Sequence, residues 1–211
     1  RRQSLVELIE QLRDDKAVDA FEKCVGRLNP QIVHFHHFIG FSVSMVDACR
    51  RLNIRTVMTL HDGWLLCEQN HFVLPDGSLC TGEYKNAAEC AECFLKRNSA
   101  LECESRQHLE RIFTWRRAFL EHAYTSMDAI ISPSEFLSLV FSQRGFRHRN
   151  LNIIKLGLPP FKVAPWNPTG RFLRFTYIGH IVPAKGLDIL VNAFKLLSHE
   201  KARLDIFGAA I

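Results

Sequence analysis

The sequence contains no apolar run near the roughly 20 residues that a membrane-spanning helix needs. It also shows no secretory signal peptide, because its first twelve residues have the pattern of a capped amphipathic helix. No G-x-G-x-x-G follows any predicted strand, which argues against a dinucleotide oxidoreductase. These absences favour a cytoplasmic protein with at most peripheral contact to the inner face of a membrane.

Acidic side chains are missing from one long stretch of the chain. No Asp or Glu lies between Phe136 and Leu187, although the whole sequence has 27 basic and 22 acidic residues. The basic residues of this stretch are Arg144, Arg147, Arg149, Lys155, Lys162, Arg171, Arg174 and Lys185. Such a segment favours an anionic ligand. Nucleic acid is disfavoured, because no helix-turn-helix, zinc-finger or stacking signature accompanies the charges. An ordinary solvated surface remains the alternative.

Strand and helix patterns alternate along the 211 residues, of which 47% are hydrophobic. Predicted strands are residues 32–35, 56–60, 128–132, 151–155 and 175–178, each followed or preceded by a helical stripe. This alternation predicts an α/β fold with a mainly parallel, Rossmann-like sheet and helices on both faces.

The alternation also predicts domain boundaries. Residues 1–155 are expected to form an N-terminal domain, interrupted by a Cys-rich insertion at 61–100. Residues 156–170 hold four prolines and no periodicity, which indicates a linker. Residues 171–211 then begin a second Rossmann-like domain.

A glycine loop lies between a strand and a helix in the segment FTYIGHIVPAKGLDILVNAF, residues 175–194. The strand reaches Gly179 and His180, and the loop places Lys185 and Gly186 at the start of the helix. Glycine permits close approach of an anion, the helix start offers free N–H groups, and lysine adds charge. The layout predicts a phosphate site, with an ordinary turn and a surface lysine as the alternative.

Four of the seven cysteines cluster in the insertion with the spacing C-x12-C-x9-C-x2-C. They are Cys67, Cys80, Cys90 and Cys93. A C-x2-C pair with two further cysteines can complete a closed structural zinc site. Four unconnected thiols or one disulfide are equally compatible with this spacing, and an iron–sulfur cluster is a remote third possibility. Cys24 and Cys49 fall on the apolar stripes of predicted helices and need no special role.

Three segments resemble family 4 glycosyltransferases of the GT-B fold, in the correct order, from about residue 30 to the end. They are VHFHHFIGFSVSMVDACRRLNIRTVMTLHDGWLLC, IISPSEF and YIGHIVPAKGLDILVNAF. The resemblance implies two Rossmann-like domains, the first binding an acceptor and the second a nucleotide-sugar. It implies a retaining transfer of sugar from that donor to a glycan or lipid-linked glycan, without a metal for catalysis.

The resemblance also implies roles for individual residues. Lys185 would contact the donor diphosphate within the loop that contains Gly179 and Gly186. The family usually has arginine where this chain has His180, which makes the second diphosphate cation weaker and pH-dependent. His61 would approach the donor sugar, with its neighbour Asp62 orienting the loop.

Two further residues would lie near the acceptor side, Gly40 after the first strand and Ser134 at the end of a later one. Each has a structural alternative: Gly40 as a turn residue and Ser134 as a helix N-cap.

The family pattern is only partly present. A first strand and glycine-rich loop would precede residue 1, and a pair of donor-binding glutamates would follow Ile211. We therefore expect a central piece of a larger enzyme that does not turn over substrate alone. The competing interpretation is a non-catalytic, zinc-stabilised ligand-binding module with a degenerate cleft.

Overall fold

The computed structural model describes residues 4–80, 86–98, 105–160, 162, 173–197 and 202–210. The chain divides into two compact units, Arg1–Leu158 and Pro159–Ile211, and each is described by itself.

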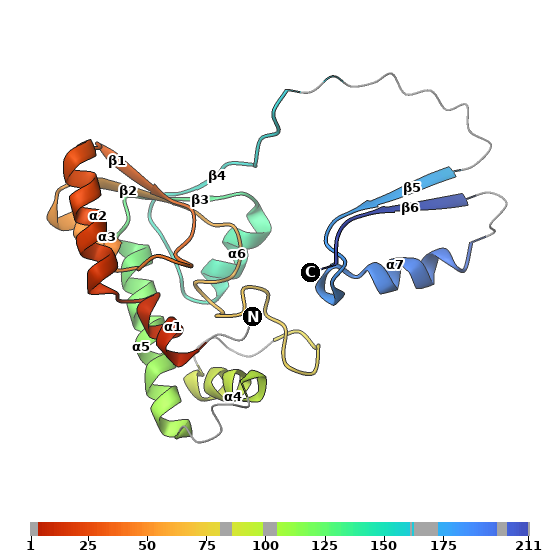
Figure 1. Ribbon diagram of the computed structural model, residues 1–211, viewed down its shortest axis with the longest axis horizontal. Helices are drawn as coiled ribbons and strands as arrows, with labels where there is room; N and C mark the ends of the chain where they lie inside the picture. The colour runs from red at the N-terminus through yellow and green to blue at the C-terminus, as the bar shows by residue number, and fades with distance from the viewer. Residues whose placement is uncertain are drawn as a thin grey trace. The chain divides into compact units, whose positions relative to one another are not determined.

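Unit 1 contains a four-stranded parallel sheet with the order β1-β2-β3-β4, flanked by helices (Figure 1). The strands are β1 (Ile32–Phe35), β2 (Arg55–Thr59), β3 (Ala129–Ser132) and β4 (Leu151–Ile153). The helices are α1 (Leu5–Glu10), α2 (Asp15–Leu28), α3 (Met45–Arg51), α4 (Ala87–Arg97), α5 (Arg106–Ser126) and α6 (Glu135–Gln143). Each strand reaches the next through a crossover segment, so all carboxyl ends meet at one edge. The predicted fold class is confirmed as a Rossmann-like α/β unit.

Local capping fixes where several helices begin. Ser4 and Glu7 form a reciprocal capping box at α1, as their spacing predicts. Asp14 accepts the Ala17 N–H at the start of α2, and Asn29 closes that helix in the left-handed conformation.

The main core lies against one face of the sheet. Strand residues alternate in burial, and the buried set includes Phe35, Met58 and Ile130, which the strand register places side by side. The helices contribute the rest of this core, including Val46 and Leu120. The burial of these apolar side chains supplies the main driving force for folding of this unit.

The Cys-rich insertion contains a helix, α4, that the sequence reading did not predict. Asn86 caps it by accepting the N–H groups of Ala88 and Glu89. Its Ala91 and Phe94 pack against α5 in a second, smaller core that also contains Leu8, Leu109, Ile112 and Phe113. Figure 1 shows α5 reaching from the sheet to α4, so this long helix joins the two cores.

Unit 2 consists of a parallel pair of strands with one helix. These are β5 (Leu173–Ile178), β6 (Ala202–Phe207) and α7 (Leu187–Phe194), with a short 3-10 turn η2 (Pro183–Lys185) before α7. Phe175 of β5 packs edge-on against Phe194 of α7, with ring centroids 6.0 Å apart. None of the described side chains of this unit is fully buried.

Most predicted elements are confirmed, with shifts of a few residues at their ends. The expectation for Cys24 was wrong: it is exposed on α2, whereas Cys49 is buried. Most of the predicted linker at 156–170 lies outside the described residues.

The core contains one polar atom whose removal should be tolerated. Tyr124 is 1% exposed and packs against Phe141 and Phe146, and its hydroxyl has no hydrogen-bond partner among the described residues. Tyr124→Phe should therefore leave the free energy of unfolding unchanged or raise it by up to about 1 kcal/mol. Urea unfolding of both proteins measures this.

Thr56→Val is the matched control, because the Thr56 hydroxyl donates to Asp128 Oδ2 at 3.3 Å. This variant should lose about 1 kcal/mol. A loss of the same size in Tyr124→Phe would mean that its hydroxyl is paired.

Candidate functional site

Two histidines meet where neighbouring strands end. His36 follows β1, and His61 lies just after β2. The parallel pairing of Phe35 with Met58 brings the carboxyl ends of these two strands together. Nδ1 of His36 lies 2.9 Å from Nε2 of His61, and the rings stack with centroids 5.2 Å apart. One of these nitrogens carries the shared proton and the other accepts it. The pair is exposed at the sheet edge where open α/β folds bind ligands.

A third histidine extends the pair along the sheet. The His34 ring lies 4.3 Å from the His36 ring, and its Nε2 is 2.8 Å from Thr59 Oγ1. Loss of water against the sheet and the nearby His36 and His61 lower the pKa of His34. The fold thus disfavours a positive charge on His34.

Asp62 fixes the loop that follows β2. Its Oδ1 accepts the Trp64 N–H at 2.9 Å, and its Oδ2 lies 3.4 Å from Nε2 of His37. Partial burial opposes ionisation of Asp62, but these two contacts outweigh burial and lower its pKa. The carboxylate therefore stays charged and orients the His61 loop.

A buried arginine supports the same loop from α5. Arg116 is 2% exposed, donates through Nη2 to the Trp64 carbonyl at 2.5 Å, and lies 5.2 Å from the centroid of the indole ring. Trp64 in turn contacts the His37 ring, with centroids 5.3 Å apart. These contacts connect the loop after β2, which holds His61 and Asp62, to helix α5 and the hydrophobic core.

Gly40 and Ser134 occupy the positions expected after β1 and β3. Gly40 has φ +79° in an exposed turn, a conformation that favours glycine. Ser134 caps α6 by accepting the Leu137 N–H at 3.2 Å. Both structural roles are therefore present, and any contact with an acceptor would be additional.

The glycine loop of unit 2 is held by its backbone. Gly179 N donates to the Phe207 carbonyl at 3.0 Å, and the Tyr177 hydroxyl donates to the His180 carbonyl at 2.8 Å. A Cβ at Gly208 would lie 1.9 Å from the Gly179 carbonyl oxygen, so only glycine fits there. The loop depends on this close approach.

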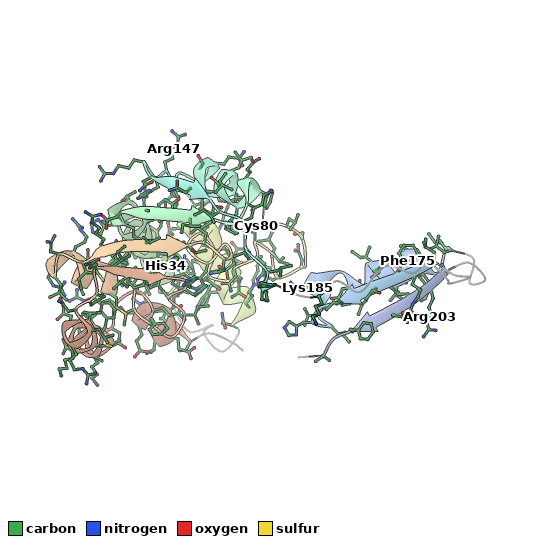
Figure 2. All side chains as sticks on the ribbon, turned by 90° about the horizontal axis from the view of Figure 1, so that it is seen from above. His34, Cys80, Arg147, Phe175, Lys185 and Arg203 are labelled. Carbon is green, nitrogen blue, oxygen red and sulfur yellow. The ribbon has the colours of Figure 1, made fainter. Side chains whose placement is uncertain are left out.

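Lys185 ends η2 at the carboxyl end of the β5–β6 pair, with an exposed side chain (Figure 2). Gly186 follows in the left-handed conformation, with φ +65°, and α7 begins at the next residue. This arrangement has the form of the predicted phosphate-binding turn.

The four cysteines of the insertion line one cavity of about 530 Å³, together with Glu68 and Arg116. Within the described ranges, no three His, Cys, Asp or Glu side chains stand in positions that could hold a metal ion. The fold thus brings the cysteines together without placing them in coordination geometry.

The comparisons agree with this architecture. A parallel Rossmann-like sheet with a polar cluster at its carboxyl edge places the chain among the α/β proteins that bind ligands at that edge. Residues 10–160 match Glycosyltransferase Family 4, and the chain belongs to this family. The matched residues span nearly all of unit 1 and do not include the glycine loop of unit 2. A search of curated proteins gave no match. Family membership indicates a glycosyltransferase-like function acting on a sugar donor and an acceptor.

The sequence analysis missed several residues of these sites, namely His34, His36, His37, Trp64, Arg116 and Gly208. The HFHH run could have pointed to His36, because alternate residues of a strand share a face. No local pattern marks Arg116, which looks like one of several charged residues on an amphipathic helix.

No helix in the described parts of the chain is long and apolar enough to cross a membrane.

The lowered pKa of His34 makes stability depend on pH. His34 has an ordinary pKa of about 6.5 in the unfolded chain and a lower one in the fold. Between these values the unfolded chain binds more protons, so this contribution is present above pH ~6.5 and is lost as pH falls. The melting temperature should therefore fall less between pH ~7.5 and ~5.5 in His34→Gln than in wild type.

His108→Gln is the control, since His108 is exposed on α5. It should show the wild-type pH dependence. Equal behaviour of the two variants would mean that His34 resists protonation no more than a surface histidine.

Proposed function

We propose that the protein transfers a sugar, with retention of anomeric configuration, from a nucleotide-sugar to a glycan or lipid-linked glycan acceptor. The His36–His61 pair is the observation that carries this proposal. It supports a site on unit 1 in which a positioned imidazole meets the sugar. The family match supports transferase chemistry in general.

His61 is proposed as the residue that contacts the reacting sugar. Its Nε2 is engaged by His36, which leaves Nδ1 as the ring nitrogen for a substrate hydroxyl. An imidazole held in this way loses little rotational freedom when the transition state forms. His36 is a positioning residue, and Asp62 keeps the loop in place through Trp64.

Catalysis is proposed to need no metal ion. As the bond from sugar to diphosphate breaks, negative charge grows on the leaving oxygen, and a positioned cation stabilises it. Lys185 supplies this charge from the start of α7, with Gly179 and Gly186 permitting backbone approach. The leaving oxygen is the best-placed acceptor for the proton of the attacking hydroxyl, so His61 is not the base.

His61→Ala tests the catalytic role in the natural full-length protein. We expect kcat to fall by about ten- to a thousand-fold, or roughly 1.4–4 kcal/mol, while donor affinity changes little. Steady-state kinetics with UDP-, GDP- and ADP-sugars, chosen by a thermal-shift screen, measure both quantities.

His108→Ala is the matched histidine control and should keep wild-type kinetics. A purely structural His61 would give a lower melting temperature with an unchanged kcat in the folded fraction, and that result would refute the catalytic role.

Lys185→Ala tests the donor contact. Because charge-assisted contacts contribute about 1.5–3 kcal/mol, nucleoside-diphosphate affinity or kcat/KM should fall correspondingly, by about ten- to a hundred-fold. Lys195→Ala serves as the control, because Lys195 lies at the far end of α7. Wild-type binding and turnover in Lys185→Ala would show that the loop does not hold the diphosphate.

Measurements of binding and of sugar transfer on a His180 variant distinguish an enzyme from a non-catalytic binding module. His180→Arg should leave diphosphate binding unchanged or improve it, more so at high pH, where a histidine is neutral. A binding module would bind its ligand and show no transfer in either form.

A further inference from the structure

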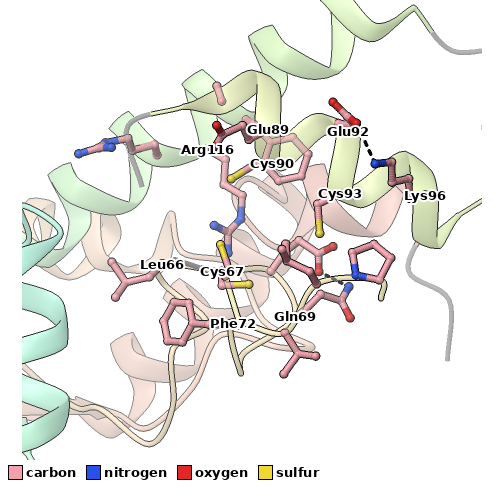
Figure 3. Close-up of a pocket in the computed structure, with 18 of the residues that line it drawn as sticks. Leu66, Cys67, Gln69, Phe72, Glu89, Cys90, Glu92, Cys93, Lys96 and Arg116 are labelled. Carbon is pink, nitrogen blue, oxygen red and sulfur yellow. Dashed lines mark hydrogen bonds and ion pairs between the residues drawn. The ribbon is translucent and has the colours of Figure 1, made fainter. Parts of the chain in front are cut away.

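Four of the six described cysteines converge on one cavity of the insertion. Cys67 follows the loop that contains His61 and Asp62, Cys80 lies further along the insertion, and Cys90 and Cys93 lie three residues apart on α4. Residues spaced by three lie on one face of a helix. Figure 3 shows the Cys67, Cys90 and Cys93 side chains directed into the same space. All four are free thiols rather than disulfides.

All four cysteines line this one cavity, so a single cation inside it would face all of them. A divalent cation displaces thiol protons and converts the thiols into ligands.

Two guanidinium groups beside the thiols have unused donors. Nε of Arg116 and Nε of Arg97 are buried and have no hydrogen-bond partner among the described residues. Figure 3 shows the Arg116 guanidinium between Cys67 and Cys90. The half-buried Glu68 is the one carboxylate whose charge both arginines affect. Buried guanidinium donors without a partner suit thiolate acceptors.

The loop that carries Cys67 and Cys80 has one apolar anchor, Phe72, which packs against the main core and whose ring centroid lies 4.7 Å from the Arg144 guanidinium carbon. Residues 67–80 include no fully buried side chain, and backbone contacts such as Cys80 N to the Phe72 carbonyl at 2.7 Å complete their fold. Arg97 adds a hydrogen bond to the Val73 carbonyl. A loop of this length without a core of its own is typically ordered by a crosslink or a metal ion.

We propose that Cys67, Cys80, Cys90 and Cys93 bind one structural zinc ion that ties the 67–80 loop to α4. Four thiolates close the tetrahedral shell and leave no position for substrate, so the site stabilises the fold. Binding draws the sulfurs from the cavity wall to Zn–S distances of about 2.3 Å. Because no side chain of residues 67–80 is fully buried, the cysteine side chains can make this movement, and the two arginines then donate to thiolate sulfurs. This inference stands independently of the proposed transfer reaction.

Metal analysis of the full-length protein, purified without chelator, tests the site. We expect about one zinc and no iron per chain. Cys90→Ser should lose the zinc, whereas Cys24→Ser, which changes an exposed cysteine of α2, should keep it. If Cys90→Ser does not fold, the melting temperature of the wild-type protein tests the site instead. Chelation should lower the melting temperature of the wild-type protein by about 4 °C or more, and added zinc should restore it.

Alkylation of the thiols identifies the ligands. In the zinc-loaded protein Cys24 should react while the four ligands are protected, and chelation should expose all four together. Replacement by cobalt should give the absorption spectrum of tetrahedral thiolate coordination. Absence of zinc, one iron–sulfur cluster, a disulfide among the four, or equal zinc loss in Cys24→Ser would overturn the proposal.

Discussion

The arrangement of unit 1 depends on one buried cation, Arg116. A guanidinium that is 2% exposed is costly to bury, and the fold compensates with the Trp64 carbonyl and the face of its indole ring. Because Trp64 also donates to Asp62 and contacts His37, the arginine fixes the loop that holds His61. On its other side the same group faces the cysteine cavity. The histidine site and the insertion thus share one anchor on α5.

The parallel strand register explains why the site is a cluster rather than scattered residues. His36 and His61 are 25 positions apart, yet their ring nitrogens are 2.9 Å apart because β1 and β2 end at the same edge. A one-residue slip would move the two side chains to opposite faces. Buried Phe35 and Met58 prevent such a slip, since it would expose both. Hydrophobic packing therefore sets the geometry of the histidine pair.

The sequence predicts elements well where pattern and capping agree. The boundaries of β1 and the capping box of α1 follow directly from local chemistry. Helix α4 was not predicted, because its cysteines resemble those of a metal-binding loop. Asn86 as an N-cap and the spacing of Ala87, Ala91 and Phe94 nevertheless indicate a helix. His61 was identified through resemblance, but its partner His36 needs the register between strands. Arg116 could not be found at all, because burial of a charged residue depends on the tertiary fold.

In unit 2 backbone geometry and charge are set by separate parts of the loop. Gly208 and Gly179 fix the path of the main chain, and the Tyr177 hydroxyl holds the carbonyl of residue 180. The side chain of His180 is exposed and takes no part in that framework. Histidine in place of arginine at position 180 therefore changes the local charge but not the backbone contacts that hold the loop. A weaker cation at position 180 is therefore compatible with an intact loop, and the proposed donor contact then depends more on Lys185.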